Sequence, residues 1–153
     1  MDEKVIIKFV KTHPEAKLPS KAYSDGDNCF DLFCVEDTTV PAFGICVGTA
    51  SVPVGLQVAF ITKGFGFVIK DKSGLGFKHN LSHFGGEIDN NYRGDMAVKI
   101  ANYSAVPYEF KKGDKVAQIK VEKIWDTELS FTDIVEEAGD ARGAGGFGSS
   151  GRS

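Results

Sequence analysis

Several features are scarce in this chain of 153 residues, and each scarcity excludes a class of protein. No apolar run approaches the ~20 residues that a membrane-spanning helix needs, so we expect no membrane association. The apolar run near the N-terminus is too short for the core of a signal peptide, so we expect a cytoplasmic location. The net charge of -3 lacks the basic excess of nucleic-acid-binding proteins. We therefore expect no nucleic-acid partner, although a local site could still bind a small polyanion.

Cysteine is scarce as well, with three residues: Cys29, Cys34 and Cys46. Their number is odd and none belongs to a C-x-x-C pair, which argues against a disulfide framework or a zinc site. His79 and His83 could in principle join them around a metal ion, but no recognised ligand spacing is present. Reduced thiols are therefore expected.

A long helical period is absent too, because apolar residues do not recur about every 3.6 positions in any window. Only residues 131–138 could form a helical turn or two. Short β-like runs separated by glycine and proline instead predict a single all-β domain over residues 1–138, a sandwich or a barrel. The expected strands are residues 5–10, 29–35, 38–40, 45–49, 56–61, 65–69, 96–100, 108–112 and 115–124.

One of these strands carries an acid among apolar neighbours. Asp31 lies between Phe30 and Leu32, and a carboxylate in a buried strand needs partners. Asp31 is therefore either a hydrogen-bonded structural acid or a residue that faces a ligand.

Residues 70–78 are expected to form a basic, glycine-rich loop. Glycine lets backbone N–H groups approach an anion, while Ser73 and the lysines add donors and positive charge. The Walker spacing G-x-x-x-x-G-K-[ST] is absent. The loop is therefore either an anion site of another kind or an ordinary surface loop.

Residues 85–94 combine turn-forming and reactive side chains. Asp89, Asn90 and Asn91 favour a turn, and glycines flank them. The half-alternating run that follows, residues 96–100, predicts a hairpin with a carboxylate, Asp89, and a phenol, Tyr92, at its mouth. An ordinary surface hairpin would present the same pattern.

The composition changes abruptly near the C-terminus, where residues 141–153 are mostly Gly, Ser and Arg. Such a segment builds no core, so residues 139–153 are expected to form a flexible tail. Its Phe147 could stack on a base and its Arg142 could pair with phosphate oxygens. A tail without function is the alternative.

Taken in order, these stretches resemble the five motifs of the homotrimeric dUTPase family, and the resemblance extends from Leu18 to Gly151. Each motif alone is weak, whereas five in the family's order are a strong signal. The matching stretches are D-N-C-F-D-L at 27–32 (family D-A-G-x-D-L), K-S-G-L-G at 72–76 (R-S-G-L-A), G-E-I-D-N-N-Y-R-G-D at 86–95 (G-V-I-D-x-x-Y-x-G-E), G-D-K-V-A-Q at 113–118 (G-x-R-x-A-Q) and R-G-A-G-G-F-G-S-S-G at 142–151 (R-G-x-G-G-F-G-S-T-G).

The resemblance implies a β-jelly roll of the dUTPase-like β-clip type that assembles as a homotrimer with shared active sites. It implies Mg²⁺-dependent hydrolysis of dUTP to dUMP and pyrophosphate, which keeps uracil out of DNA and supplies dUMP for dTMP synthesis. By this likeness Asp89 is the catalytic base that deprotonates the attacking water, and Tyr92 packs under the deoxyribose. Asp31 holds waters on a Mg²⁺ ion that the triphosphate itself binds.

The remaining family roles concern the base and the phosphates. The resemblance implies that the hairpin backbone from Gly86 to Tyr92 reads uracil. It also implies that the tail of one subunit closes over a site built by the others. The substrate-binding residues that it implies are Lys72, Ser73, Gly74, His83, Gly86, Ile88, Tyr92, Gln118, Arg142, Phe147, Gly148, Ser149 and Ser150.

The chain departs from the family pattern at several of these positions. Lys72 replaces an arginine and gives up bidentate hydrogen bonding. His83 stands where an asparagine is usual, and Glu87 replaces an apolar residue beside Asp89. An Asn-Cys pair at 28–29 replaces Ala-Gly. Together these departures indicate a divergent member.

Two other functions fit the same scaffold. The related dCTP deaminases carry a catalytic glutamate where this chain has Lys99, and a lysine cannot replace that carboxylate in proton transfer. The other is a binding protein that uses the dUTPase scaffold to engage another protein, with the nucleotide as its switch. Fold does not fix function, so this alternative stays open.

Overall fold

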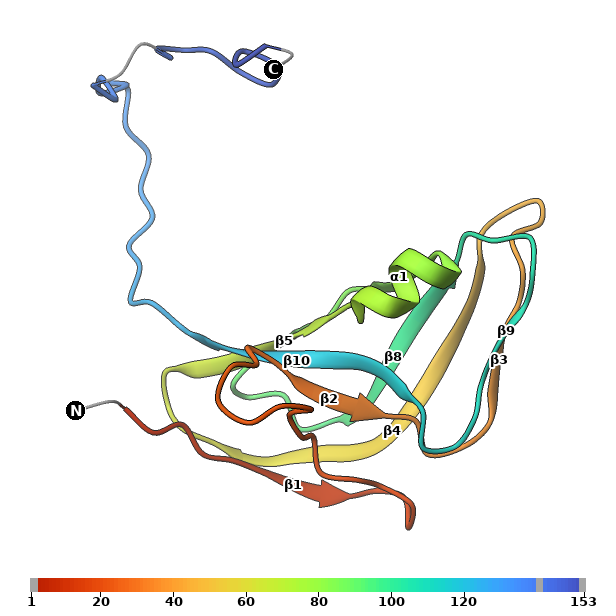
Figure 1. Cartoon of the computed structure of the whole chain (residues 1–153). Helices are drawn as coiled ribbons and strands as arrows, with labels where there is room; N and C mark the ends of the chain where they lie inside the picture. The colour runs from red at the N-terminus through yellow and green to blue at the C-terminus, as the bar shows by residue number, and fades with distance from the viewer. Residues whose placement is uncertain (1–2, 140–141, 152–153) are drawn as a thin grey trace.

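The computed structural model describes residues 3–139 and 142–151 and shows a body of β-strands followed by an extended segment (Figure 1). The all-β prediction is confirmed. The strands form two four-stranded sheets, with the orders β1-β4-β8-β6 and β2-β10-β5-β7, and a two-stranded sheet of β3 and β9. The elements are β1 (Ile7–Lys11), β2 (Phe30–Phe33), β3 (Thr38–Val40), β4 (Gly48–Ile61), β5 (Phe65–Lys70), α1 (Ser73–His79), β6 (Leu81–Phe84), β7 (Glu87–Ile88), β8 (Asp95–Asn102), β9 (Tyr108–Phe110) and β10 (Lys115–Lys123).

The two four-stranded sheets share one apolar core. Phe9 of β1 and Phe67 of β5 meet edge to face across the sheets, with ring centroids 6.3 Å apart. In β8 the inward positions Met96, Val98 and Ile100 are buried while the residues between them are exposed. This alternation is what a strand with one solvated face requires.

Strand β4 differs from the prediction. The sequence predicts two strands, residues 45–49 and 56–61, but β4 is continuous across Pro53 and Gly55. The prediction was wrong because the backbone bends there without breaking, with a shift in the register against β8 between Pro53 and Gln57. Gly55 has a φ of 66°, and a Cβ at this position would lie 2.8 Å from the Cβ of His13.

The loop predicted at residues 70–78 is wrong as well, because helix α1 occupies most of it. Two glycines, Gly74 and Gly76, lie inside this helix, and each disfavours a helix by roughly 1 kcal/mol, which hides it from sequence patterns. The carbonyl of Lys72 accepts two N–H bonds from the first turn. Asn80 ends the helix in the left-handed conformation with a φ of 53°.

Residues 131–138 form no helical turn, although the sequence allowed one there. The chain after β10 instead runs out from the β-body in an extended conformation (Figure 1). We call residues 124–139 the arm. Large apolar side chains are exposed along it, which is typical of a surface that a partner covers. They are Ile124, Trp125, Leu129, Phe131, Ile134 and Val135.

Helix α1 is the only helix in the described ranges, and its seven residues are too few to cross a bilayer. The cytoplasmic location and the division into residues 1–138 and 139–153 stay predictions.

Candidate active site

Asp31 lies at the centre of a charged cluster on β2. Asp31 is buried, with only 3% of its surface exposed. Oδ1 pairs with the Nζ of Lys72 at 2.6 Å, and Oδ2 pairs with the Nζ of Lys115 at 2.9 Å. Burial raises the pKa of this carboxyl, but the hydrogen bonds and charges of the two lysines outweigh burial and lower it below its ordinary value. Asp31 is therefore a paired structural acid.

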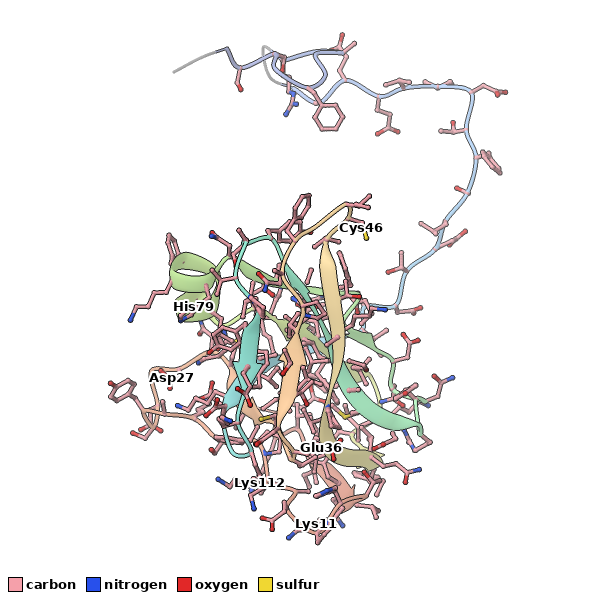
Figure 2. The ribbon with its side chains drawn as sticks, turned by 90° about the vertical axis from the view of Figure 1, so that its right-hand side faces the viewer. Lys11, Asp27, Glu36, Cys46, His79 and Lys112 are labelled. Atoms are coloured by element: carbon pink, nitrogen blue, oxygen red, sulfur yellow. The ribbon has the colours of Figure 1, made fainter. Side chains whose placement is uncertain are left out.

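A cleft of about 400 Å³ opens beside this cluster, so Asp31 also faces a possible ligand. Gln118 of β10 forms part of its wall and is fixed by a hydrogen bond from its Nε2 to the backbone oxygen of Asp71 at 2.7 Å. Figure 2 shows Asp27 on a loop that projects from the β-body next to this region. Lysine and amide donors of this kind suit a phosphate. The cleft is lined by Ala22, Tyr23, Gly26, Asp27, Asn28, Cys29, Asp31, Lys72 and Gln118.

A Mg²⁺ ion held by the protein alone does not fit this cleft. Both oxygens of Asp31 already pair with ammonium groups. Residues 3–139 and 142–151 contain no cluster of three or more His, Cys, Asp or Glu side chains that could bind a metal ion. Mg²⁺ usually takes one or two carboxylates together with waters and substrate phosphates. The residues present therefore fit only an ion that is held mainly by the phosphates of a ligand.

Asp89 lies in the connection between the paired strands β6 and β8, residues 85–94, which we call the hairpin; it contains the short strand β7, which pairs with β5. Asp89 follows β7 directly and is exposed. The next residue anchors the turn, because Asn90 Nδ2 donates to the backbone oxygens of Phe65 at 2.7 Å and of Thr62 at 3.1 Å. The protein's own hydrogen bonds thus tie the turn at Asp89 to the turn between β4 and β5.

Tyr92 is fixed in the same turn. Its hydroxyl donates to the backbone oxygen of Asp95 at 2.9 Å. Arg93 Nη1 donates to the backbone oxygens of Asn90 and Tyr92, both at 2.8 Å. A Cβ at Gly94 would lie 2.5 Å from the Tyr92 hydroxyl, so any larger residue there would displace the Tyr92 ring. The turn therefore presents the carboxylate and the phenol in set positions.

Gly86 lies where the hairpin runs beside β5. Its carbonyl accepts the N–H of Ile69 at 2.8 Å. Its φ is 114°, and a Cβ would lie 2.9 Å from the oxygen of Ile69 and 3.0 Å from Nε2 of His83. Ile88 pairs with β5 two residues further on. The ring of His83 thus packs against the hairpin backbone while its other nitrogen, Nδ1, pairs with Asp71.

The remaining predicted residues lie in two places. Ser73 and Gly74 are exposed at the start of α1, beside Lys72. The tail has its own turn, in which Arg142 Nε donates to the oxygen of Gly145 at 3.0 Å, and Figure 1 shows the tail beyond the arm. The predicted tail residues are absent from the lining of the cleft in this chain; they are Arg142, Phe147, Gly148, Ser149 and Ser150.

Similarity to known proteins extends over most of the chain. The family described as dUTPase matches residues 15–151. The chain belongs to the dUTPase family. A deoxyuridine 5'-triphosphate nucleotidohydrolase from Wolinella succinogenes is 37% identical to it over 99% of this chain and 97% of its own length. The protein of the same name from Saccharomyces cerevisiae is 35% identical over 95% of each chain.

Solved dUTPase structures share the fold. The dUTPase of Staphylococcus bacteriophage 80alpha with dUPNHPP has a TM-score of 0.81 at 22% identity and covers 96% of this chain and 99% of its own. A mutant dUTPase of phage phi11 of S. aureus, described for its coordination of a structural Mg(II) ion, has a TM-score of 0.74 at 20% identity, over 86% of this chain and 99% of its own. The predicted jelly-roll fold is confirmed.

In this dUTPase family member the two halves of the site lie at opposite ends of β5. Near one end Phe67 pairs with Ile88, which immediately precedes Asp89. At the other end Lys70 pairs with Gln118. At about 3.3 Å per residue, Asp89 and Gln118 are roughly 13 Å apart along the strands. A single chain therefore holds the Asp89 carboxylate apart from Gln118 and the charged cluster around Asp31.

Sequence reasoning missed three residues that build this dUTPase family site. Lys115 occupies the arginine position of the G-x-R-x-A-Q motif, and this signal was present but attributed to no role. Asn90 and Asp71 carry no such signal, because their partners are backbone atoms and His83, which are close only in the folded chain. Their roles can be recognised only in the folded chain, where the hairpin and β5 lie side by side.

Proposed function

We propose that this protein is a dUTP diphosphatase that hydrolyses dUTP to dUMP and pyrophosphate. The observation that carries the proposal is the hairpin, where Asp89 stands exposed on a turn that Asn90 and Arg93 hold in place. Membership of the dUTPase family and the names of the curated relatives support the same reaction. Phosphoryl transfer mainly requires positioning and charge stabilisation from a protein, and the turn supplies a positioned acceptor.

In the proposed reaction Asp89 orients a water and takes its proton. The water oxygen attacks the α-phosphorus, the bond from this phosphorus to the α,β-bridging oxygen breaks, and pyrophosphate leaves. General-base catalysis contributes roughly 10²–10⁴-fold to such a rate. Tyr92, whose hydroxyl is held by the Asp95 carbonyl, packs its ring under the deoxyribose. A ring in this position leaves no room for a 2'-hydroxyl.

The phosphates and the base are bound by different parts of the chain. Lys72, Ser73, Gly74 and Gln118 hold phosphate oxygens near the cleft, and the hairpin backbone at Gly86 and Ile88 reads uracil. Bound Mg²⁺ would supply charge neutralisation on the phosphates, and Asp31 would hold it through water. The two lysines that pair with Asp31 support this arrangement, because together with its carboxylate they leave a net positive charge beside the cleft.

We also propose that the active form is a homotrimer with shared sites. The roughly 13 Å between Asp89 and Gln118 along β5 supports this, since a base that acts at the α-phosphorus and an amide that binds the phosphates should lie closer together, as residues of two different subunits can. The exposed apolar side chains of the arm support an assembly that covers them. An apolar groove of about 220 Å³ on the body adds a second surface of the same kind, lined by Val5, Ile7, Phe9, Leu18, Pro19, Phe30, Ile119 and Val121.

In this assembly the tail acts as a lid. Arg142, Ser149 and Ser150 bind the β- and γ-phosphates, and Phe147 stacks on the base with Gly148 beside it. The exposure of Phe147 and the glycine content of the tail support this role, because a lid must open to release product.

The experiment is to incubate the purified protein with Mg²⁺ and dUTP, dTTP, dCTP or UTP separately, and to measure pyrophosphate and ammonia. The proposal predicts pyrophosphate from dUTP and little from the other three. Ammonia from dCTP would overturn it in favour of deamination, although Lys99 supplies no carboxylate. Silence on all four nucleotides would favour the binding protein that uses the nucleotide as a switch.

A further inference from the structure

Asp71 contacts both Gln118 and the strand that precedes the hairpin, although no motif contains it. It lies between β5 and α1, and its backbone oxygen accepts the Nε2–H of Gln118 at 2.7 Å. Its carboxylate faces the other way, to the hairpin: Oδ1 accepts the backbone N–H of His83 at 2.8 Å and Oδ2 accepts the Ser82 hydroxyl at 3.0 Å. One residue therefore connects the phosphate side with the strand that leads into the base-reading hairpin.

The ring of His83 extends this connection. Its Nδ1 pairs with Oδ1 of Asp71 at 2.5 Å, and the side chain is 17% exposed. Since a carboxylate accepts hydrogen bonds, Nδ1 carries the proton and the Nε2 edge is left to face the hairpin. A Cβ at Gly86 would lie 3.0 Å from Nε2, so this edge of the ring lies against the backbone of Gly86. The ring of His83 thus packs between the carboxylate of Asp71 and the hairpin backbone.

The charge state of Asp71 suits this role. Burial raises the pKa of its carboxyl, but hydrogen bonds from the His83 ring, the His83 N–H and Ser82 outweigh burial and lower it. Asp71 is therefore ionised at neutral pH. Hydrogen bonds to an ionised acceptor are roughly twice as strong as neutral ones.

The far end of the hairpin has an anchor of its own. Asn90 ties the turn at Asp89 to the carbonyls of Phe65 and Thr62, independently of His83. Loss of the Asp71 contacts would therefore loosen the base end of the hairpin more than the end that carries Asp89.

We propose that Asp71 and His83 form a positioning pair that fixes the base-reading hairpin at Gly86 to the phosphate side of the same chain. The expected change in KM rests on the proposed dUTP hydrolysis, whereas the role of the pair in fixing the hairpin does not. Neither residue is a catalytic residue; both act through the backbone of the hairpin.

The kinetic test compares Asp71→Ala, Asp71→Asn and the wild type with dUTP. The pair predicts a KM about tenfold higher in Asp71→Ala, the size expected for a lost charge-assisted hydrogen bond, and a smaller change in kcat. Asp71→Asn restores much of the KM, because its amide oxygen can still accept from Nδ1. Asp37→Asn is the matched control, since Asp37 also accepts a backbone N–H, from Lys112, but far from the hairpin.

A spectroscopic test needs no substrate. The ¹⁵N spectrum of the His83 ring should show the proton on Nδ1 in the wild type and in Asp71→Asn, and a shift toward Nε2 protonation in Asp71→Ala. An unchanged tautomer together with an unchanged KM in Asp71→Ala would overturn the positioning pair. Failure of the wild type to hydrolyse dUTP would overturn the proposed function instead, while the ¹⁵N result would still decide the pair.

Discussion

At the scale of single residues, the buried carboxylate of Asp31 shows how far sequence reasoning reaches. The position of an acid between Phe30 and Leu32 predicts that partners must exist, and two lysines provide them. Both partners lie in recognised motifs, but neither motif indicates a contact with Asp31. Lys115 is close only because β2 and β10 pair, with Lys115 opposite Phe33. A contact between strands far apart in the sequence has no local signature.

Replacing Asp31 by Asn should destabilise the folded protein by about 1–3 kcal/mol at pH 7, because two ammonium groups lose a buried partner. The lysines reach solvent, which keeps the loss below that of a fully buried pair. The pKa of Asp31 is lower in the folded state than in the unfolded one, so its contribution is complete above the unfolded value of about 3.9 and is lost as the pH falls below it. Urea unfolding at fixed protein concentration checks this. A gap between wild type and Asp31→Asn that stays constant down to pH 2 would contradict it.

At the scale of elements, strand positions were predictable and the exceptions have physical causes. Alternation identifies β8 and β10 because one face of each is buried. It fails at α1, where two glycines hide a helix that the Lys72 carbonyl and the cap at Asn80 stabilise. It also fails at β4, where Gly55 bends a strand that the sequence divides in two. At β4 the deciding contacts come from the paired strands β1 and β8, outside the local window, whereas at α1 they are local and the two glycines mask them.

The hairpin is the element on which the chemistry depends, and Asn90 is its anchor. Asn90→Ala removes the hydrogen bonds to Phe65 and Thr62, so Asp89 should lose its fixed position. We expect kcat for dUTP to fall roughly 10- to 100-fold, since small misplacements of a catalytic group have effects of that size. Asn91→Ala is the matched control, because Asn91 is exposed and makes no side-chain hydrogen bond in the described part of the chain. Equal kcat values in the two variants would refute this role of Asn90.

The tail is an element with a separate test. Deleting residues 142–153 removes every phosphate and base contact that the proposal assigns to the lid. The shortened protein should fold and assemble as the full chain does, because the core lies entirely within the body. Its kcat/KM for dUTP should fall by at least about 100-fold, through loss of phosphate binding and exclusion of water. Size-exclusion chromatography and a pyrophosphate assay measure the two properties, and unimpaired hydrolysis would mean that the tail is no lid.

At the scale of the whole molecule, the arm and the divided site both indicate that one chain is incomplete. The arm exposes apolar side chains that a lone subunit leaves in water. Asp89 and Gln118 lie at opposite ends of β5 in each chain. From the sequence, trimer formation follows only from the resemblance to the family, because no local pattern reports which chain supplies a residue.

Mixing two inactive variants tests the shared site. Asp89→Asn and Gln118→Ala chains should each hydrolyse dUTP poorly. When they are co-expressed, some sites receive an intact Asp89 from one subunit and an intact Gln118 from another. Activity should therefore reappear in the mixed oligomers. If the mixture is no more active than the two variants measured separately, both residues serve the site from the same chain.

The central claim is that the fixed carboxylate of Asp89 activates the water that cleaves dUTP. The most direct measurement compares wild type and Asp89→Asn for binding of the imido analogue dUPNHPP by calorimetry and for pyrophosphate release under saturating dUTP and Mg²⁺. Binding should be preserved, because asparagine has the same shape, while kcat should fall by about 10²–10⁴-fold, the usual contribution of a general base. An Asp89→Asn protein that releases pyrophosphate at the wild-type rate would contradict the account.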